Sequence, residues 1–187
     1  MKVAALYVDS ERGPYAAAPS VDPWDLSRDA TRYNGTLPVI AHPPCGHWGN
    51  YAHRCHDDGS TGPIAVEQVR KCGGVLEHPR GSKLWKHCGL PRPGEFADAW
   101  GGYTIEIRQC DWGHVAEKRT WLYIVGTTDL PPMPERAEPT GLTIRKPSGR
   151  LSSPLERMAK NRRHLTPPTL AEWLIELARR CAKDPNA

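Results

Sequence analysis

An apolar run that ends in two prolines and a cysteine, residues 39–45 (VIAHPPC), constrains this chain more than any other stretch. Its first three residues suit a buried strand of a parallel sheet. The prolines must end that strand because proline cannot donate to the hydrogen-bond ladder. Ligands of open α/β sheets bind at the carboxyl ends of the strands. The run therefore predicts a strand that delivers Cys45 to the ligand-binding edge of a sheet; a buried, inert thiol is the alternative.

A short helix and a second strand follow in the order that a parallel crossover needs. Residues 63–72 have apolar positions at helical spacing, with Thr61 as the predicted cap and Gly73 as the predicted end. Residues 74–79 (GVLEHP) predict a short apolar strand with Glu77 near its end. Because such crossovers are right-handed and make the two strands parallel, Glu77 is expected beside the cysteine at one sheet edge. A glutamate paired with a neighbouring basic residue is the alternative.

Further strands are expected on either side of this unit. Residues 2–8 predict a first buried strand. Residues 103–107 alternate in polarity and residues 121–125 are rich in β-formers, so they are expected to pair as an antiparallel hairpin at the end of the sheet. The loop between them, residues 113–119, is expected to point back toward the edge that carries the cysteine.

In order and spacing, these motifs resemble those of the DNA cytosine-5 methyltransferases. In that family a Pro-Pro-Cys strand end, a Glu-Asn-Val strand end and a hairpin running from Gly-Tyr to Gln-x-Arg-x-Arg follow one another. The likeness covers roughly residues 37–126. It implies an α/β fold of the Rossmann-like, S-adenosylmethionine methyltransferase type. Such a fold has a mostly parallel sheet with a C-terminal antiparallel hairpin, and here its cofactor-binding region is reduced.

The resemblance also implies a reaction. In the family's mechanism a thiolate attacks C6 of a cytosine held out of the base stack, an acid near N3 neutralises the charge on the ring, and C5 takes a one-carbon unit. Cys45 would be the nucleophile, and Glu77 would be the acid, protonated or sharing a proton with N3. Arg119 falls on the first arginine of the hairpin motif and would position the base, with Lys118 as its neighbour.

The same resemblance implies S-adenosylmethionine as the donor. The family's Phe-x-Gly-x-Gly loop has a single glycine here, within residues 9–15, although a backbone that approaches a cofactor closely uses glycines. The implied cofactor contacts are Asp9, Gly13, Asp22, Asp29 and Pro43. For Asp22 and Asp29 the favoured alternative is that they cap turns and pair with Arg28 or Arg32.

Aromatic and basic positions predict a nucleic-acid partner, because such residues stack on bases and contact phosphates. The predicted contacts are His47, Trp48, Lys83, Lys118, Arg145, Arg162 and Arg163. A net charge of +4 permits DNA, or a pyrimidine nucleotide, without requiring either, and a solvated basic face is the alternative. The Cys-x-His and His-x-Cys pairs at 45–47 and 53–55 are closer together than typical zinc ligands, so no metal site is predicted.

A chain of 187 residues suits one domain. Residues 1–126 are predicted to form a truncated methyltransferase-like catalytic core. Residues 127–165 are a proline-rich irregular segment in place of a target-recognition domain, and residues 166–183 a C-terminal helix that packs back on the core. Because the middle part is too short for an independent domain, an oligomer or a helper subunit could supply sequence discrimination.

No apolar run approaches the ~20 residues that span a membrane, and no signal peptide is evident beside the six cysteines. A cytoplasmic protein with reduced thiols is therefore expected. DNA cytosine C5 modification by a methyltransferase-like transferase is the leading expectation for function. The alternatives are a pyrimidine base- or nucleotide-modifying enzyme that uses another donor, and a non-catalytic nucleic-acid-binding relative.

Overall fold

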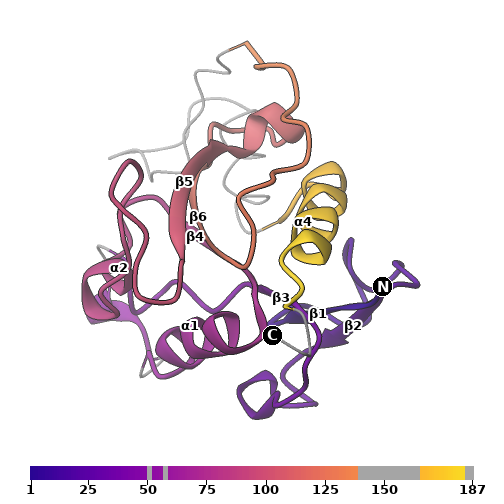
Figure 1. Ribbon diagram of the computed structural model, residues 1–187. Helices are drawn as coiled ribbons and strands as arrows, with labels where there is room; N and C mark the ends of the chain where they lie inside the picture. Colours follow the sequence, from indigo (N-terminus) through magenta and orange to yellow (C-terminus); the bar gives the residue numbers. More distant parts are fainter. Residues whose placement is uncertain (50–51, 57–58, 139–164, 184–187) are drawn as a thin grey trace.

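The computed structural model describes residues 1–49, 52–56, 59–138 and 165–183, in which one six-stranded sheet has helices on both faces (Figure 1). The strands are β1 (Val3–Leu6), β2 (Val21–Trp24), β3 (Val39–Ala41), β4 (Gly74–Pro79), β5 (Tyr103–Arg108) and β6 (Arg119–Val125). The helices are α1 (Thr61–Cys72), α2 (Lys83–His87) and α4 (Pro168–Arg180), with short 3-10 helices η1 (Ala30–Arg32), η2 (Ala52–Arg54) and η3 (Gln109–Trp112). None of the helices in these ranges is long and apolar enough to cross a membrane.

The strand order across the sheet is β2-β1-β3-β4-β6-β5. β2, β1, β3 and β4 are parallel, whereas β6 is antiparallel to both of its neighbours, β4 and β5. β5 therefore runs in the same direction as β4, with β6 inserted between them. This arrangement confirms the predicted α/β class, the parallel pair formed by residues 39–41 and 74–79, and the antiparallel hairpin at the end of the sheet.

Alternate residues of the strands enter two hydrophobic cores. Val3 and Ala5 of β1 belong to the core under α4, whereas Ala4 and Leu6 belong to the core under α1. All four side chains are fully buried. Burial on both faces explains why the strand sequences are continuous apolar runs. The fully buried Leu174 of α4 packs in the first core, so the C-terminal helix covers the sheet as predicted.

Two local predictions need correction. α1 begins at Thr61 itself and is preceded by Ser60, which makes no side-chain cap, so Thr61 is not the capping residue. Gly73 ends the helix as predicted, with φ +75°. Residues 21–24 form β2, which the sequence did not predict as a strand. Its Pro23 is tolerated because β2 lies at the edge of the sheet, where one row of backbone groups needs no partner.

Gly74 begins β4 at a point where only glycine fits. Its φ is +130°, and a Cβ atom there would lie 2.0 Å from the carbonyl oxygen of Val39 on β3. Gly74→Ala is therefore expected to lower the free energy of unfolding, measured in urea, by about 2 kcal/mol more than Gly81→Ala does. Gly81 is the matched control because its φ is also positive, +75°, but its Cβ would meet nothing within 4 Å. Equal losses of unfolding free energy in the two variants would show that the close contact with β3 does not destabilise Gly74→Ala.

Candidate active site

A cavity of about 540 Å³ lies at the carboxyl ends of β1, β3 and β4. β2 and β3 pair with opposite sides of β1, so the order of the chain reverses there, and such switch points are where open α/β sheets bind ligands. The volume is within the range of small-molecule sites. The walls come from residues 7–9 and 12–15 after β1, residues 42–45 after β3, Glu77 and Pro79 of β4, Lys118 before β6, and residues 165–166 before α4.

Cys45 and Glu77 both line this cavity, as the parallel crossover from β3 to β4 predicts. Pro43 and Pro44 end β3 and lead directly to Cys45, whose side chain is exposed. An exposed thiol at a strand end differs from the buried, inert cysteine that was the alternative. The cavity therefore offers a ligand both a thiol and a carboxyl group.

Glu77 is ionised, and Gln109 and His42 bind its two carboxylate oxygens. Its Oε1 accepts a hydrogen bond from Nε2 of Gln109 at 2.9 Å, and its Oε2 lies 3.1 Å from Nδ1 of His42. Burial opposes ionisation, since Glu77 is only 7% exposed, but the charge of Lys118 and the hydrogen bond from His42 outweigh burial and lower the pKa of Glu77 to about 2. The protonated Glu77 expected from the sequence is therefore corrected. This carboxylate can share a proton with a ring nitrogen only if another group supplies it.

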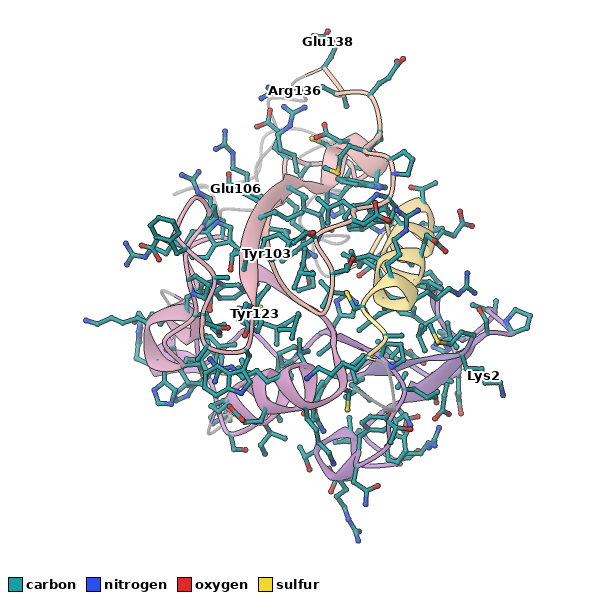
Figure 2. All side chains as sticks on the ribbon, viewed as in Figure 1. Lys2, Tyr103, Glu106, Tyr123, Arg136 and Glu138 are labelled. Atoms are coloured by element: carbon teal, nitrogen blue, oxygen red, sulfur yellow. The ribbon has the colours of Figure 1, made fainter. Side chains whose placement is uncertain are left out.

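Lys118, rather than Arg119, is the cation of this hairpin that reaches the cavity. Lys118 lines the cavity, is 7% exposed, and has no carboxylate of the described chain within 4.0 Å of its ammonium group. Arg119 pairs with Glu106 at 3.3 Å, and that glutamate projects from the edge strand β5 (Figure 2). Arg119 does not line the cavity. The predicted base-positioning arginine is therefore engaged elsewhere, and its neighbour takes the place beside Glu77.

The predicted cofactor contacts divide into two groups. Asp9, Gly13 and Pro43 line the cavity. At Gly13 the backbone has φ +100° and open space where a side chain would be, so this turn could come close to a ligand. Oδ1 of Asp9, however, already accepts hydrogen bonds from the backbone N–H groups of Glu11 and Arg12.

Asp22 and Asp29 do not line the cavity. Asp22 accepts hydrogen bonds from Trp24 and Arg28, and Asp29 caps η1. These are the turn-capping and ion-pairing roles of the alternative interpretation. The resemblance implies that these two carboxylates hold the cofactor's ribose and adenine, but neither reaches the cavity. The residues present therefore do not fit that cofactor in the manner the resemblance implies.

The predicted nucleic-acid contacts are also divided. Trp48 is 7% exposed and packs in the core under α1, with its ring 4.9 Å from that of His87, so little of its ring is open for stacking on a base. His47 is half-buried and contacts Trp48 edge to face. Lys83 is exposed at the start of α2. Arg145, Arg162 and Arg163 lie outside the described residues.

The sequence matches no protein-family model and no curated protein. The site is therefore interpreted from its own groups. The six cysteines, all within the described ranges, form no disulfide, and these ranges contain no cluster of three or more metal-ligating side chains. Two contributors were not selected from the sequence: Tyr15 and Gln109. His42 had a usable signal, since it sits in the same strand-end motif as Cys45, whereas Gln109 comes from η3 and carried none.

Proposed function

We propose that this protein modifies a pyrimidine base at C5, with cytosine in DNA as the leading substrate. One observation carries the proposal: the exposed thiol of Cys45, the ionised Glu77 and the ammonium group of Lys118 line one cavity at a switch point of the sheet. The mostly parallel sheet with one inserted antiparallel strand supports the Rossmann-like methyltransferase type that the motifs resemble. A conjugate addition needs a thiolate, a partner for the exocyclic amine and a cation near the developing charge.

In the proposed first step the thiolate of Cys45 forms a bond to C6 of the ring. The electrons of the C5–C6 double bond then move toward N3, which takes up a proton, and C5 becomes nucleophilic. Lys118 would stabilise negative charge that spreads to O2, and Glu77 would accept a hydrogen bond from the exocyclic amine. When C5 has taken an electrophile, the C5 proton passes to water, N3 gives back the proton it took up, and departure of the thiolate restores the C5–C6 double bond.

This first step can be tested without knowing the donor. In D2O the nucleophilic C5 takes a deuteron, and reversal returns a base with deuterium in place of the C5 hydrogen. Mass spectrometry of the digested substrate measures this exchange. Duplex DNA, single-stranded DNA and deoxycytidine monophosphate are compared, and uptake only in DNA is expected. Uptake in the nucleotide alone would favour the second candidate below.

The donor requires a separate experiment. An oligonucleotide that contains 5-fluorocytosine is incubated with and without S-adenosylmethionine and analysed by denaturing mass spectrometry. Because fluorine cannot leave C5 as a proton does, an adduct persists once C5 has accepted carbon from the donor. A persistent adduct that depends on S-adenosylmethionine would identify the donor. Deuterium exchange without such an adduct would point to another one-carbon compound.

A second candidate function is favoured by the cofactor contacts. Asp22 and Asp29 do not reach the cavity, whereas Arg12 and Lys118 line it and could bind a phosphate group. This arrangement suits modification of a free pyrimidine nucleotide with a different donor. The comparison of DNA with the nucleotide in the exchange experiment separates the two candidates.

The two neighbouring cations of the hairpin give a matched pair of variants. Lys118→Met is expected to lower the C5 exchange rate by roughly 10²-fold, because a charge buried beside the reacting ring is lost. Arg119→Met, which removes a 47% exposed side chain paired with Glu106, should change the rate less than about threefold. Exchange rates at saturating substrate provide the comparison. The opposite ranking would return the base-positioning role to Arg119.

A further inference from the structure

A chain of three hydrogen-bonded side chains lies in the wall of the cavity. Tyr15 Oη lies 2.8 Å from Nε2 of His42, and Nδ1 of His42 lies 3.1 Å from Oε2 of Glu77. All three residues line the cavity, and each comes from a different segment of the chain. Building on the proposed function, we propose that Tyr15 donates the proton that the ring nitrogen takes up, that His42 replaces the proton Tyr15 gives, and that Glu77 is the positioning residue behind them.

The direction of the hydrogen bonds follows from counting protons. Glu77 is ionised and can only accept, so Nδ1 of His42 must carry a hydrogen. In a neutral His42, Nε2 then accepts a hydrogen bond from the hydroxyl of Tyr15. When His42 takes a second proton, Nε2 becomes a donor and the bond to Tyr15 reverses. The hydroxyl hydrogen of Tyr15 is then free for an acceptor in the cavity.

This second state supplies what the proposed reaction needs. As the thiolate adds to C6, N3 of the ring takes the hydroxyl proton of Tyr15, and His42 passes its Nε2 proton to the tyrosine oxygen. The proton that Tyr15 gives is thus replaced from His42, and Glu77 holds His42 through its Nδ1. When the ring later loses a proton, the same path returns it to His42. No oxidant, reductant or further reactant is involved, so the step is balanced.

Glu77 cannot take this role directly because its carboxylate has no proton to give. Tyr15 is 3% exposed, and burial, together with the charge of Glu77, raises its pKa, so its hydroxyl stays protonated. The titratable groups around His42 are Tyr15, Glu77, His78 and Lys118. A donor suits cytosine in particular, because its N3 carries a lone pair, whereas N3 of uracil carries a hydrogen.

Deuterium exchange at C5 tests the chain in the full-length protein. Tyr15→Phe and His42→Gln are each expected to lower the rate about 10²-fold, and the double variant should lose no more than either single variant, since the two groups act in one path. Tyr33→Phe is the control, because its hydroxyl hydrogen-bonds to the backbone of Leu37 and Tyr33 does not line the cavity.

The outcomes separate this assignment from the proposed function. If the wild-type protein exchanges deuterium and Tyr15→Phe does so at the same rate, the donor role of Tyr15 is wrong and the proposed function stands. If the wild-type protein does not exchange, the proposed function fails, and the donor role fails with it.

The hydrogen-bond chain itself has a readout that does not depend on activity. In protein labelled with 15N-histidine, His42, assigned through His42→Gln, is expected to carry its hydrogen on Nδ1 when neutral, and Tyr15→Phe should shift the Nε2 resonance. A neutral His42 with hydrogen on Nε2 would contradict the chain.

Discussion

Replacing Cys45 with serine is expected to lower the rate of C5 deuterium exchange by ~10³-fold or more, because a hydroxyl is a far weaker nucleophile than a thiolate at this position. The side chain of Cys45 is exposed at the end of β3, so the free energy of unfolding should change by less than about 0.5 kcal/mol. Loss of exchange with retained stability would identify a chemical role for the thiol.

Cys55 provides the matched control for this experiment. It belongs to the same loop region, where its Sγ lies 2.4 Å from the position that a Cβ atom of Gly46 would occupy, and it does not line the cavity. Cys55→Ser should therefore keep the wild-type exchange rate. If Cys45→Ser keeps its activity, or if both variants lose it equally, Cys45 is not the nucleophile.

The protein should become markedly less stable in acid, because protonation of Glu77 removes the stability that its ionised form gives. Its folded-state pKa of about 2 is below its ordinary value of 4.5, so the unfolded chain binds the proton more readily. The stabilisation is therefore complete above pH 4.5 and is lost as the pH falls from 4.5 to about 2. The shift corresponds to about 3 kcal/mol of unfolding free energy.

Glu77→Gln should remove this pH dependence and destabilise the protein at neutral pH by a similar amount, with the two proteins converging near pH 2. Urea unfolding followed between pH 2 and 7 measures both effects. Glu67→Gln is the control, because that side chain is 66% exposed on α1. Lys118→Met should move the acid transition to higher pH, since Lys118 is the strongest influence that favours the anion. An unchanged pH slope in Glu77→Gln would show that Glu77 is not the titrating group.

The parts of the fold that followed from the sequence are those with strong local patterns. The apolar run at residues 39–41 and the strand at 74–79 are separated by a helix of crossover length, so their parallel pairing could be inferred. That pairing brought Cys45 and Glu77 together. β2 was missed because Asp22 and Pro23 interrupt its apolar pattern, and only its edge position makes them acceptable.

The charges in the site, and the residues that carry them, could not be inferred from the sequence. Whether Arg119 or Lys118 reaches the cavity depends on the direction in which the turn before β6 points each side chain. A motif in the sequence does not specify that direction. The ionisation of Glu77 depends on Lys118 and His42, which come from separate parts of the chain.

Trp48 belongs to an aromatic, basic loop by composition, but its ring fills the core beside α1.

The most direct test of the central claim is the C5 exchange measurement on the wild-type protein in D2O without any added donor. Attack of Cys45 on C6 predicts that cytosine in DNA gains one deuterium at C5, and that Cys45→Ser abolishes this gain. Absence of deuterium from duplex DNA, single-stranded DNA and the free nucleotide alike would contradict covalent pyrimidine chemistry at this cavity.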